Sequence, residues 1–523
     1  MVLKKETRAD SNILIIDASK GFTKVGNKNQ LRPSDIKKIT DTVIQRKSID
    51  KYSRLVTLEE IRSNDYNLNI PRYVDSSDPT ETWDIYSLMF GGIPKHEIKI
   101  MDKYWSKFPS LKRELFDESN DSYITLKDVN IEETIVNNKE VKNYFNNYNE
   151  QFSSFKKFLE NRLIDNMMSL NISQEEETIT QDIFTRLEPF TLVDKYKAYQ
   201  VFNDEWVNIS LDLEIIQTEG FQATKKVDPN MVTKKRKNKE VEVQEGWLGR
   251  IIPFDIVQKT ILKEESNNLK KIEQDLNDIE VKTQEIIDEL DEEYKEKLLN
   301  DTNDAFNKAA LKKEIEEIRE EITSPEISQL NMYLSFLKSK PNKQEKLEFI
   351  DQSDQVDWDK LSANKDGTFG KIAVNKYLKE LISTYEFPED SMEYMLCLVE
   401  ELFDHERQLN QEIKVKTNEL HATTKDVIEN LTDNEAKNLL VEKWIHPLIG
   451  SIDQLSEEII KDITDHVKNL SDKYSETLSD IMIEIEDNNK ILVSLIDELE
   501  GDESDMKGLS EFQSILKGDY NGT

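Results

Sequence analysis

The chain is predicted to be mainly α, with the end of an α/β domain at its start and long helical hairpins behind it. Charged residues make up 33% of its 523 residues while Gly and Pro are few, a balance that suits long solvated helices. Apolar residues recur at spacings of three and four through most of the chain. One apolar run, ILIIDAS at residues 13–19, instead indicates a buried strand of an α/β sheet.

Residues 1–75 are expected to complete that sheet domain. A buried strand needs neighbours on both sides, and the residues before Ile13 supply at most part of one, so the chain is expected to start near the end of the domain. Thr57 and Glu60 have the spacing of a capping box and predict a helix from Leu58. The stretch LNIPRYV, residues 68–74, is expected to be extended because a residue before proline avoids the α region.

Residues 76–260 are expected to form a helical domain that contains an aromatic stripe. A helix–helix core is the favoured interpretation of the stripe, and stacking on nucleic-acid bases is the alternative. The stripe consists of Tyr144, Tyr148, Phe152, Phe155 and Phe158.

A basic loop is expected at residues 222–244, where the helical pattern is interrupted. Lysine and arginine bind phosphates, so this cluster is a candidate DNA contact, although solvated loops are often equally basic. The candidate contacts are Lys234, Lys235, Arg236 and Lys237.

Residues 261–430 are expected to form long coiled-coil-like hairpins, with a small unit near residues 356–380. The return arm is expected at residues 311–322, with a second hairpin over 392–428. The apolar seam either binds helices of a partner chain or belongs to a solvated antiparallel hairpin without a partner. The seam consists of Leu269, Ile272, Leu276, Ile279, Ile286 and Leu290, and the polar Thr283 occupies one position of the repeat. Residues 431–523 are expected to form a C-terminal helical element.

Composition excludes several classes of function. A net charge of −35 argues against DNA binding by the isolated chain but allows docking on a basic partner. No apolar run approaches the ~20 residues that span a membrane. The single cysteine, Cys397, cannot form an internal disulfide, which suits a cytoplasmic location. The five histidines lack paired metal-ligand spacing, and no P-loop or G-x-S-x-G occurs, so no catalytic, cofactor-binding or metal residue is assigned.

Two N-terminal segments resemble the last part of the catalytic domain of type I restriction-modification M (modification) subunits. They are MVLKKETRADSNILIIDASKGF at residues 1–22 and RLVTLEEIRSNDYNLNIPRYVD at residues 54–75. Four later blocks are similar, in order, to the C-terminal region of longer family members: GGIPKHEIKIMDKYWSKFPSLKRELF at 91–116, LVDKYKAYQVFNDEW at 192–206, EGWLGRIIPFDIV at 245–257 and LTDNEAKNLLVEKWI at 431–445.

The resemblance implies adenine-specific DNA N6-methyltransferase activity with S-adenosylmethionine in the intact enzyme. It also implies an S (specificity) subunit as partner, with the R (restriction) subunit as a further candidate and DNA bound in the assembled complex. The spacer helices of S would suit the seam at 269–290.

The chain departs from the family where the cofactor and the target base are held. The family uses a D-P-A-x-G-T-G turn, where glycine lets the backbone approach the cofactor, and an N-P-P-F motif that holds the flipped adenine. Neither occurs here, and there is no G-x-G in the sequence. The chain is therefore expected to be the C-terminal portion of a split, truncated or mis-started M subunit. On this expectation it binds no cofactor alone and is inactive without the N-terminal methyltransferase portion.

The most motif-like residues are Asn69, Pro71, Arg72 and Tyr73, with Arg72 as the best contact for a phosphate or for S. The alternative is that NIPRYV simply closes the sheet domain, with Tyr73 in its core. For the chain as a whole, the alternatives are a non-enzymatic coiled-coil scaffold and the product of a decayed gene.

Overall fold

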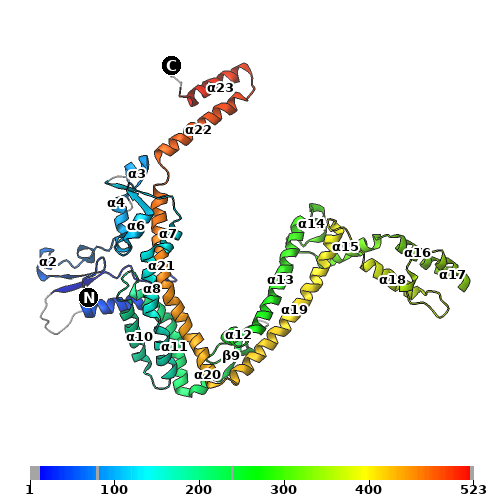
Figure 1. Cartoon of the computed structure of the whole chain (residues 1–523), viewed down its shortest axis with the longest axis horizontal. Helices are drawn as coiled ribbons and strands as arrows, with labels where there is room; N and C mark the ends of the chain where they lie inside the picture. Colours follow the sequence, from blue (N-terminus) through cyan, green and yellow to red (C-terminus); the bar gives the residue numbers. More distant parts are fainter. Residues whose placement is uncertain (1–11, 78–81, 119–120, 237–238, 519–523) are drawn as a thin grey trace. The chain divides into compact units, whose positions relative to one another are not determined.

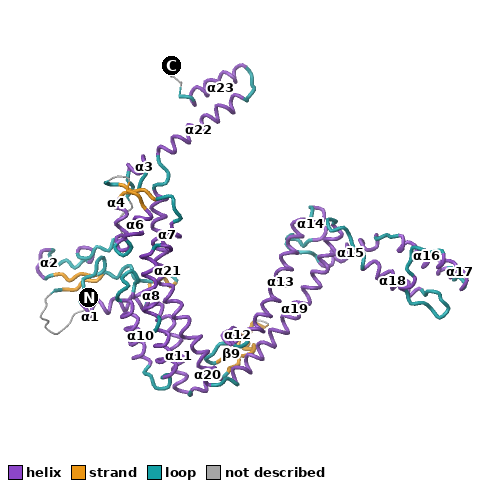
Figure 2. The backbone as a smooth tube through the Cα atoms, in the orientation of Figure 1, coloured by secondary structure: helices purple, strands orange, loops and turns teal. Residues whose placement is uncertain are grey.

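The computed structural model describes residues 12–77, 82–118, 121–236 and 239–518, and its described part is mainly helical, as predicted (Figure 2). The chain forms two compact units. Unit 1 comprises residues 1–226, 250–252 and 431–523, and unit 2 comprises residues 227–249 and 253–430. The C-terminal segment 431–523 thus folds with the N-terminal half of the chain. None of the described helices is both long and apolar enough to cross a membrane.

Unit 1 begins with a two-stranded sheet. Strand β1 (Ile13–Ile16) pairs antiparallel with β4 (Ser53–Val56), and the small hairpin β2 (Thr23–Val25) and β3 (Lys28–Gln30) and helix α1 (Pro33–Gln45) lie between them in the sequence. The prediction of a fully buried strand is wrong: Ile15 is buried, but Ile13 is 38% exposed. The reason is that β4 is the one strand that pairs with β1 among the described residues.

The capping prediction is confirmed and the extended-segment prediction is corrected. Helix α2 (Leu58–Ser63) starts where the Glu60 N–H donates to the Thr57 hydroxyl at 3.2 Å. The expected extended stretch instead contains a 3₁₀ turn, η1 (Ile70–Arg72), because proline's fixed φ also suits the first turn of a helix. A small core of Ile15, Val56, Ile61, Tyr73 and Val74 joins these elements.

The rest of unit 1 is a helical bundle with one small sheet of strands β5 (Ile93–Pro94), β6 (Phe116–Glu118) and β7 (Tyr123–Leu126). Its early helices are α3 (Ile85–Phe90), α4 (Lys95–Ile98), α5 (Asp102–Trp105), α6 (Pro109–Leu115) and α7 (Ile131–Asn137). Its later helices are α8 (Lys139–Phe152), α9 (Phe155–Leu159), α10 (Ile172–Leu187), α11 (Lys195–Glu219), α20 (Asp433–Leu440), α21 (His446–Lys473), α22 (Leu478–Asp497) and α23 (Glu503–Leu516).

The aromatic stripe lies in the core of this bundle, as its favoured interpretation predicts. Tyr148, Phe152 and Phe155 are buried, and the Tyr148 hydroxyl donates to the Ile452 carbonyl of α21 at 2.8 Å. Phe190 packs edge-on against Tyr148. These rings therefore hold helices together and are not free to stack on nucleic-acid bases.

Unit 2 contains a β-hairpin where a basic loop was expected. Strand β8 (Val227–Arg236) pairs antiparallel with β9 (Lys239–Gly249), and valines alternate with charged or polar residues in the first half of β9, a pattern that suits a strand. The base of the hairpin is anchored on α19 (Met392–Glu429), where the Trp247 N–H donates to His421 Nε2 at 2.9 Å. Lys425 of α19 also lies 4.2 Å from the centre of the Trp247 ring.

Helix α13 (Lys263–Glu289) runs alongside α19 in the opposite direction (Figure 1). Ile272, Ile279, Ile286 and Leu290 of the predicted seam are buried in a cluster that includes Leu396 and Leu409 of α19. Residues 392–429 form one continuous helix instead of a second hairpin, and this helix is the return arm. The expected arm, residues 311–322, lies mostly in α15 (Lys308–Glu321), which packs on the same cluster.

Between α15 and α19 in the sequence, unit 2 also contains a small group of helices with an aromatic core. It contains α16 (Pro325–Lys338), α17 (Lys343–Asp351) and α18 (Lys371–Ser383), packed around Tyr333 and Phe369. The remaining helices of unit 2 are α12 (Phe254–Thr260) and α14 (Glu292–Leu298).

Candidate functional site

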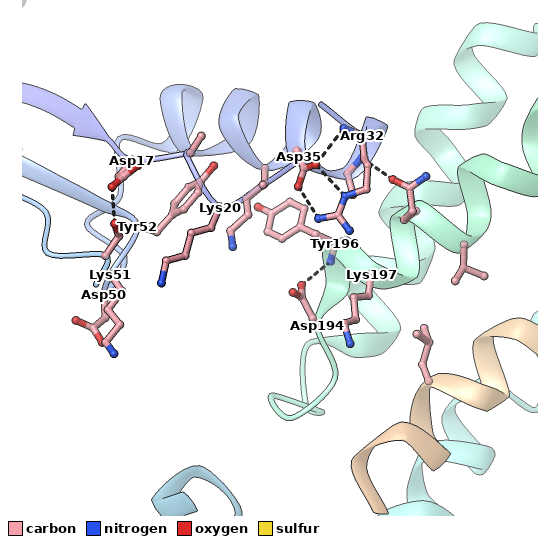
Figure 3. Close-up of a pocket in the computed structure, with 18 of the residues that line it drawn as sticks. Asp17, Lys20, Arg32, Asp35, Asp50, Lys51, Tyr52, Asp194, Tyr196 and Lys197 are labelled. Atoms are coloured by element: carbon pink, nitrogen blue, oxygen red, sulfur yellow. Dashed lines mark hydrogen bonds and ion pairs between the residues drawn. The ribbon is translucent and has the colours of Figure 1, made fainter. Parts of the chain in front are cut away.

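A cavity of about 520 Å³ in unit 1 joins the N-terminal segment to the helical bundle (Figure 3). Its lining contains five lysine or arginine and five aspartate or glutamate side chains, so the charges of the two signs are balanced. The charged residues come from the segment around β1 and α1, from the start of α11 and from α21: Asp17, Lys20, Arg32, Asp35, Lys38, Asp50, Lys51, Asp194, Lys197 and Glu458.

Asp17 follows directly after β1, and backbone and side-chain donors hold its carboxylate in place. The Ser76 hydroxyl donates to it at 2.5 Å and the Ser19 N–H at 3.0 Å. The hydrogen bond from Ser76, followed by those from Ser19, holds the pKa of Asp17 below its ordinary value. The bond from Ser76 also connects the two ends of the N-terminal segment.

A second anchored carboxylate stands at the start of α1. Arg32 donates from two guanidinium nitrogens to Asp35 at 2.9 and 3.0 Å, and the Arg32 N–H donates to the same carboxylate. These hydrogen bonds hold the pKa of Asp35 below its ordinary value and raise the pKa of Arg32. A carboxylate in the first turn is also favoured by the helix dipole.

Lys38 of α1 connects the two sides of the cavity through its ring contacts. Its ammonium lies 4.4 Å from the centre of the Tyr52 ring and 5.8 Å from that of Tyr196 at the start of α11. Burial raises the pKa of Tyr52 to about 12 and also raises the pKa of Tyr196, so both phenols stay neutral at physiological pH. The ammonium is attracted by the negative faces of the two rings.

Most of the charged groups in the cavity lining are already engaged within the chain. Three of the lining aspartates are held by hydroxyl, arginine and helix-cap contacts: Asp17, Asp35 and Asp194. Across the described residues, no group of three or more His, Cys, Asp or Glu is placed to hold a metal ion. The cavity can therefore hold segments together or take a polar group between its lysines.

The predicted site residues of the NIPRYV segment differ in their exposure to solvent. Asn69, Pro71 and Arg72 are exposed, and they form or precede the 3₁₀ turn. Tyr73 is only 4% exposed, and its hydroxyl donates to the Asn67 carbonyl at 2.6 Å. Tyr73 is thus a core residue, as the alternative interpretation stated, while Arg72 remains accessible to a partner.

The predicted basic residues lie near the end of the β8–β9 hairpin. Lys234 forms an ion pair with Glu245, and Lys235 stands opposite Glu240 in the strand register. Acidic residues on β9 therefore offset part of the positive charge. Arg236 ends β8, and its side chain and the whole of Lys237 lie outside the described residues.

None of the cavity residues was among the predicted site residues, although several lie in the family-like blocks of the sequence. Asp194, Tyr196 and Lys197 fall within the family-like block at 192–206, and Asp17 falls within the block at 1–22. Nothing in either block shows that the two blocks meet, because residues 23–191 separate them in the sequence.

Comparison with known proteins finds similarity to one family at the start of the chain. The model of the N-6 DNA methylase family matches residues 1–82. No solved structure matches the chain.

Three curated relatives share part of the sequence. The type I restriction enzyme MjaVII methylase subunit of Methanocaldococcus jannaschii is 37% identical over 110 residues, which are 20% of this chain and 19% of the relative. The MjaVIII methylase subunit of the same organism is 32% identical over 111 residues, 21% and 18% of the two chains. The MpnII methylase subunit of Mycoplasma pneumoniae is 33% identical over 85 residues, 16% of each chain. In each case the match spans less than a fifth of the relative's length.

Proposed function

We propose that the chain is the C-terminal part of a type I restriction-modification methyltransferase (M) subunit, from the premise that the model of the N-6 DNA methylase family matches its residues 1–82. In this role it assembles with an S subunit and with the catalytic portion. The assembled enzyme transfers a methyl group from S-adenosylmethionine to N6 of adenine in DNA. The observation that carries the proposal is the family match, together with relatives that are type I methylase subunits.

The packing of unit 1 supports a role in carrying the methylase-like segment. Helix α1, which lies inside the matched residues, packs against α11 of the bundle. Lys37 of α1 pairs with Glu177 of α10 at 3.2 Å, and the Ser34 N–H donates to Gln200 of α11 at 3.1 Å. These contacts attach the segment to the bundle through two different helices.

The missing motifs support a role that is not catalytic in isolation. The sequence contains neither a G-x-G nor an N-P-P-F. A cofactor turn needs glycine because side chains would keep the backbone away from the cofactor, and base flipping needs a pocket for the extruded adenine. S-adenosylmethionine is therefore proposed to bind the catalytic portion and not this chain alone.

Contacts to S or DNA are proposed at accessible residues. Arg72, with Asn69 and Pro71 beside it, and Lys234 and Lys235 on the hairpin are the candidates. The seam of α13, which the sequence suggested as a contact for S, is not among the candidates because its apolar side chains pack on α19. The R subunit remains a further candidate partner.

The Arg72→Ala variant tests the first of these contacts. It is expected to weaken DNA or S binding of the reconstituted complex several-fold, with about one unit less salt dependence if the partner is a phosphate. Arg62→Ala, an exposed arginine at the end of α2, is the matched control. Equal binding by both variants and the unmodified chain would leave Arg72 as an ordinary surface residue.

The whole proposal is tested by co-expression with an S subunit and a separate N-terminal methyltransferase portion, followed by affinity capture and an adenine-methylation assay. A complex that methylates only when all parts are present is the expected result. Methylation by the purified chain alone would contradict the proposal that the catalytic activity lies in the N-terminal portion. Failure to form any complex would leave a stand-alone helical scaffold.

A further inference from the structure

The C-terminal hairpin of α22 and α23 carries an apolar row that no described part of unit 1 covers. Five side chains of α22 form this row and are each between 42% and 53% exposed: Leu478, Ile481, Ile485, Leu492 and Leu495. We call them the C-terminal seam. Contiguous exposed apolar side chains on one helix face mark interaction sites, because isolated ones are common but rows are not.

The spacing of the C-terminal seam is that of a helix that pairs with another helix. From Leu478 to Leu495 the steps alternate three and four residues, with Asn488 completing the series. This is the a/d repeat of a coiled coil, in which one polar residue commonly sets the register. The seam of α13 has the same repeat, but there α19 covers it.

Helix α23 lies on a different side of α22 and leaves the seam open. Gln513 of α23 donates to the Val493 carbonyl at 3.0 Å and to the Asp497 carboxylate at 2.7 Å. Ile496 is the buried residue of α22. Val493, Ile496 and Asp497 are outside the a/d positions, so the internal packing of the hairpin does not use the seam.

Helix α3 extends the apolar surface at the start of α22. The two helices are in contact, and Ile85 and Phe90 of α3 are 74% and 65% exposed. The exposed apolar surface is therefore not confined to α22.

The negative charge around the C-terminal seam indicates which kind of helix can bind there. Residues 478–516 contain eleven Asp or Glu and two Lys. A second copy would place like charges along the whole interface, which is destabilising, whereas a basic helix would complement them. We propose that the C-terminal seam docks a cationic amphipathic helix of another chain. This inference goes beyond the proposed function and does not depend on it.

The test uses the full chain and a synthetic helical peptide of about four heptads, with Leu at a and d and Lys or Arg elsewhere. A peptide of the same composition in scrambled order measures attraction by charge alone. Ile485→Glu disrupts the seam, and Ile483→Glu is the matched control, since Ile483 is 57% exposed on the opposite side of α22. Thermal melts of both variants check that the fold is kept.

The heptad peptide is expected to bind at least about tenfold more weakly to the Ile485→Glu variant than to the Ile483→Glu variant, because an anchor lies at the centre of the interface. Both substitutions add the same negative charge, so binding driven by charge alone would be equal in the two and would overturn the proposal. Equal binding of the scrambled peptide would also overturn it. A dimer of the chain that Ile485→Glu dissociates and Ile483→Glu does not would assign the seam to a second copy instead.

Discussion

At the residue scale, the buried charges of unit 1 show how the late part of the sequence is attached to the early part. Asp212 of α11 is 7% exposed and accepts hydrogen bonds from the ammonium of Lys443 at 2.5 Å and from the Trp444 indole at 2.8 Å. Lys443 also donates to the Ile251 carbonyl at 2.6 Å. The Asp212 carboxylate and the Lys443 ammonium together thus connect three segments that are distant in the sequence.

Replacing Asp212 by Asn is expected to destabilise unit 1 by about 2 to 3 kcal/mol, because Lys443 would remain largely buried without its counter-charge. Chemical denaturation followed by circular dichroism measures the change. Glu458→Gln is the control: Glu458 and Lys197 form an ion pair at 3.1 Å whose side chains are about half exposed, so its loss should cost no more than about 0.5 kcal/mol. Equal effects of the two substitutions would contradict the importance of the buried carboxylate.

Asp17 makes stability depend on pH in a defined direction. Its pKa in the folded chain is lowered, chiefly by the Ser76 hydroxyl, so its contribution is fully present above the unfolded pKa of about 4 and is lost as pH falls through the lower folded value. The melting temperature of the unmodified chain should exceed that of Asp17→Asn at pH 6. The difference should shrink below about pH 4. A difference in melting temperature that grows on acidification would contradict a lowered pKa of Asp17 in the folded chain.

At the scale of the element, periodicity predicted which face of α13 is buried but not what covers it. Its seam packs on α19, more than 100 residues further along the chain, instead of mainly on the nearer segment 311–322. Several amphipathic helices offer similar apolar faces, and sequence spacing does not rank them. The β8–β9 hairpin is a second example of what sequence spacing does not predict. Its basic residues were visible in the sequence, but the position of Lys235 opposite Glu240 was not.

Ile279→Ala in α13 is expected to lower the stability of unit 2 by about 2 to 4 kcal/mol, since it removes buried methyl and methylene groups and leaves a cavity against α19. Val281→Ala, two residues away and 49% exposed, should change stability by less than about 0.5 kcal/mol. Denaturant unfolding of both variants distinguishes the seam from the solvated face. Equal losses would show that α13 does not pack on α19 in solution.

At the scale of the whole molecule, unit 1 is completed by residues 431–523 in a way that no local pattern shows. Trp444, Leu448, Ile452 and Ile463 of the C-terminal segment are almost fully buried. They pack through α21 against α7, α8 and α11. Two segments separated by all of unit 2 therefore share one hydrophobic core.

A chain ending at residue 430 is expected to lose the cooperative fold of unit 1, because the faces of α7, α8 and α11 that meet α21 would be left in water. A chain ending at residue 477 lacks only α22 and α23 and should keep it, since Ile496 is the one buried residue of α22. Size-exclusion chromatography and limited proteolysis compare the two. A folded unit 1 in the shorter chain would contradict the shared core.

The sequence by itself determined the helical class, the methylase-like start, the capping of α2 at Thr57, and the burial of the aromatic stripe, because these follow from composition, short motifs and spacing within one element. Only the tertiary structure decided that Tyr73 is buried while Arg72 is exposed. Likewise, only the structure showed that Lys38 reaches Tyr196 across the cavity and that the α13 seam is covered while the C-terminal seam is open. The physical reason is that apolar burial is non-directional: a pattern shows that a face must be covered, but which of several equivalent faces covers it depends on how the whole chain packs.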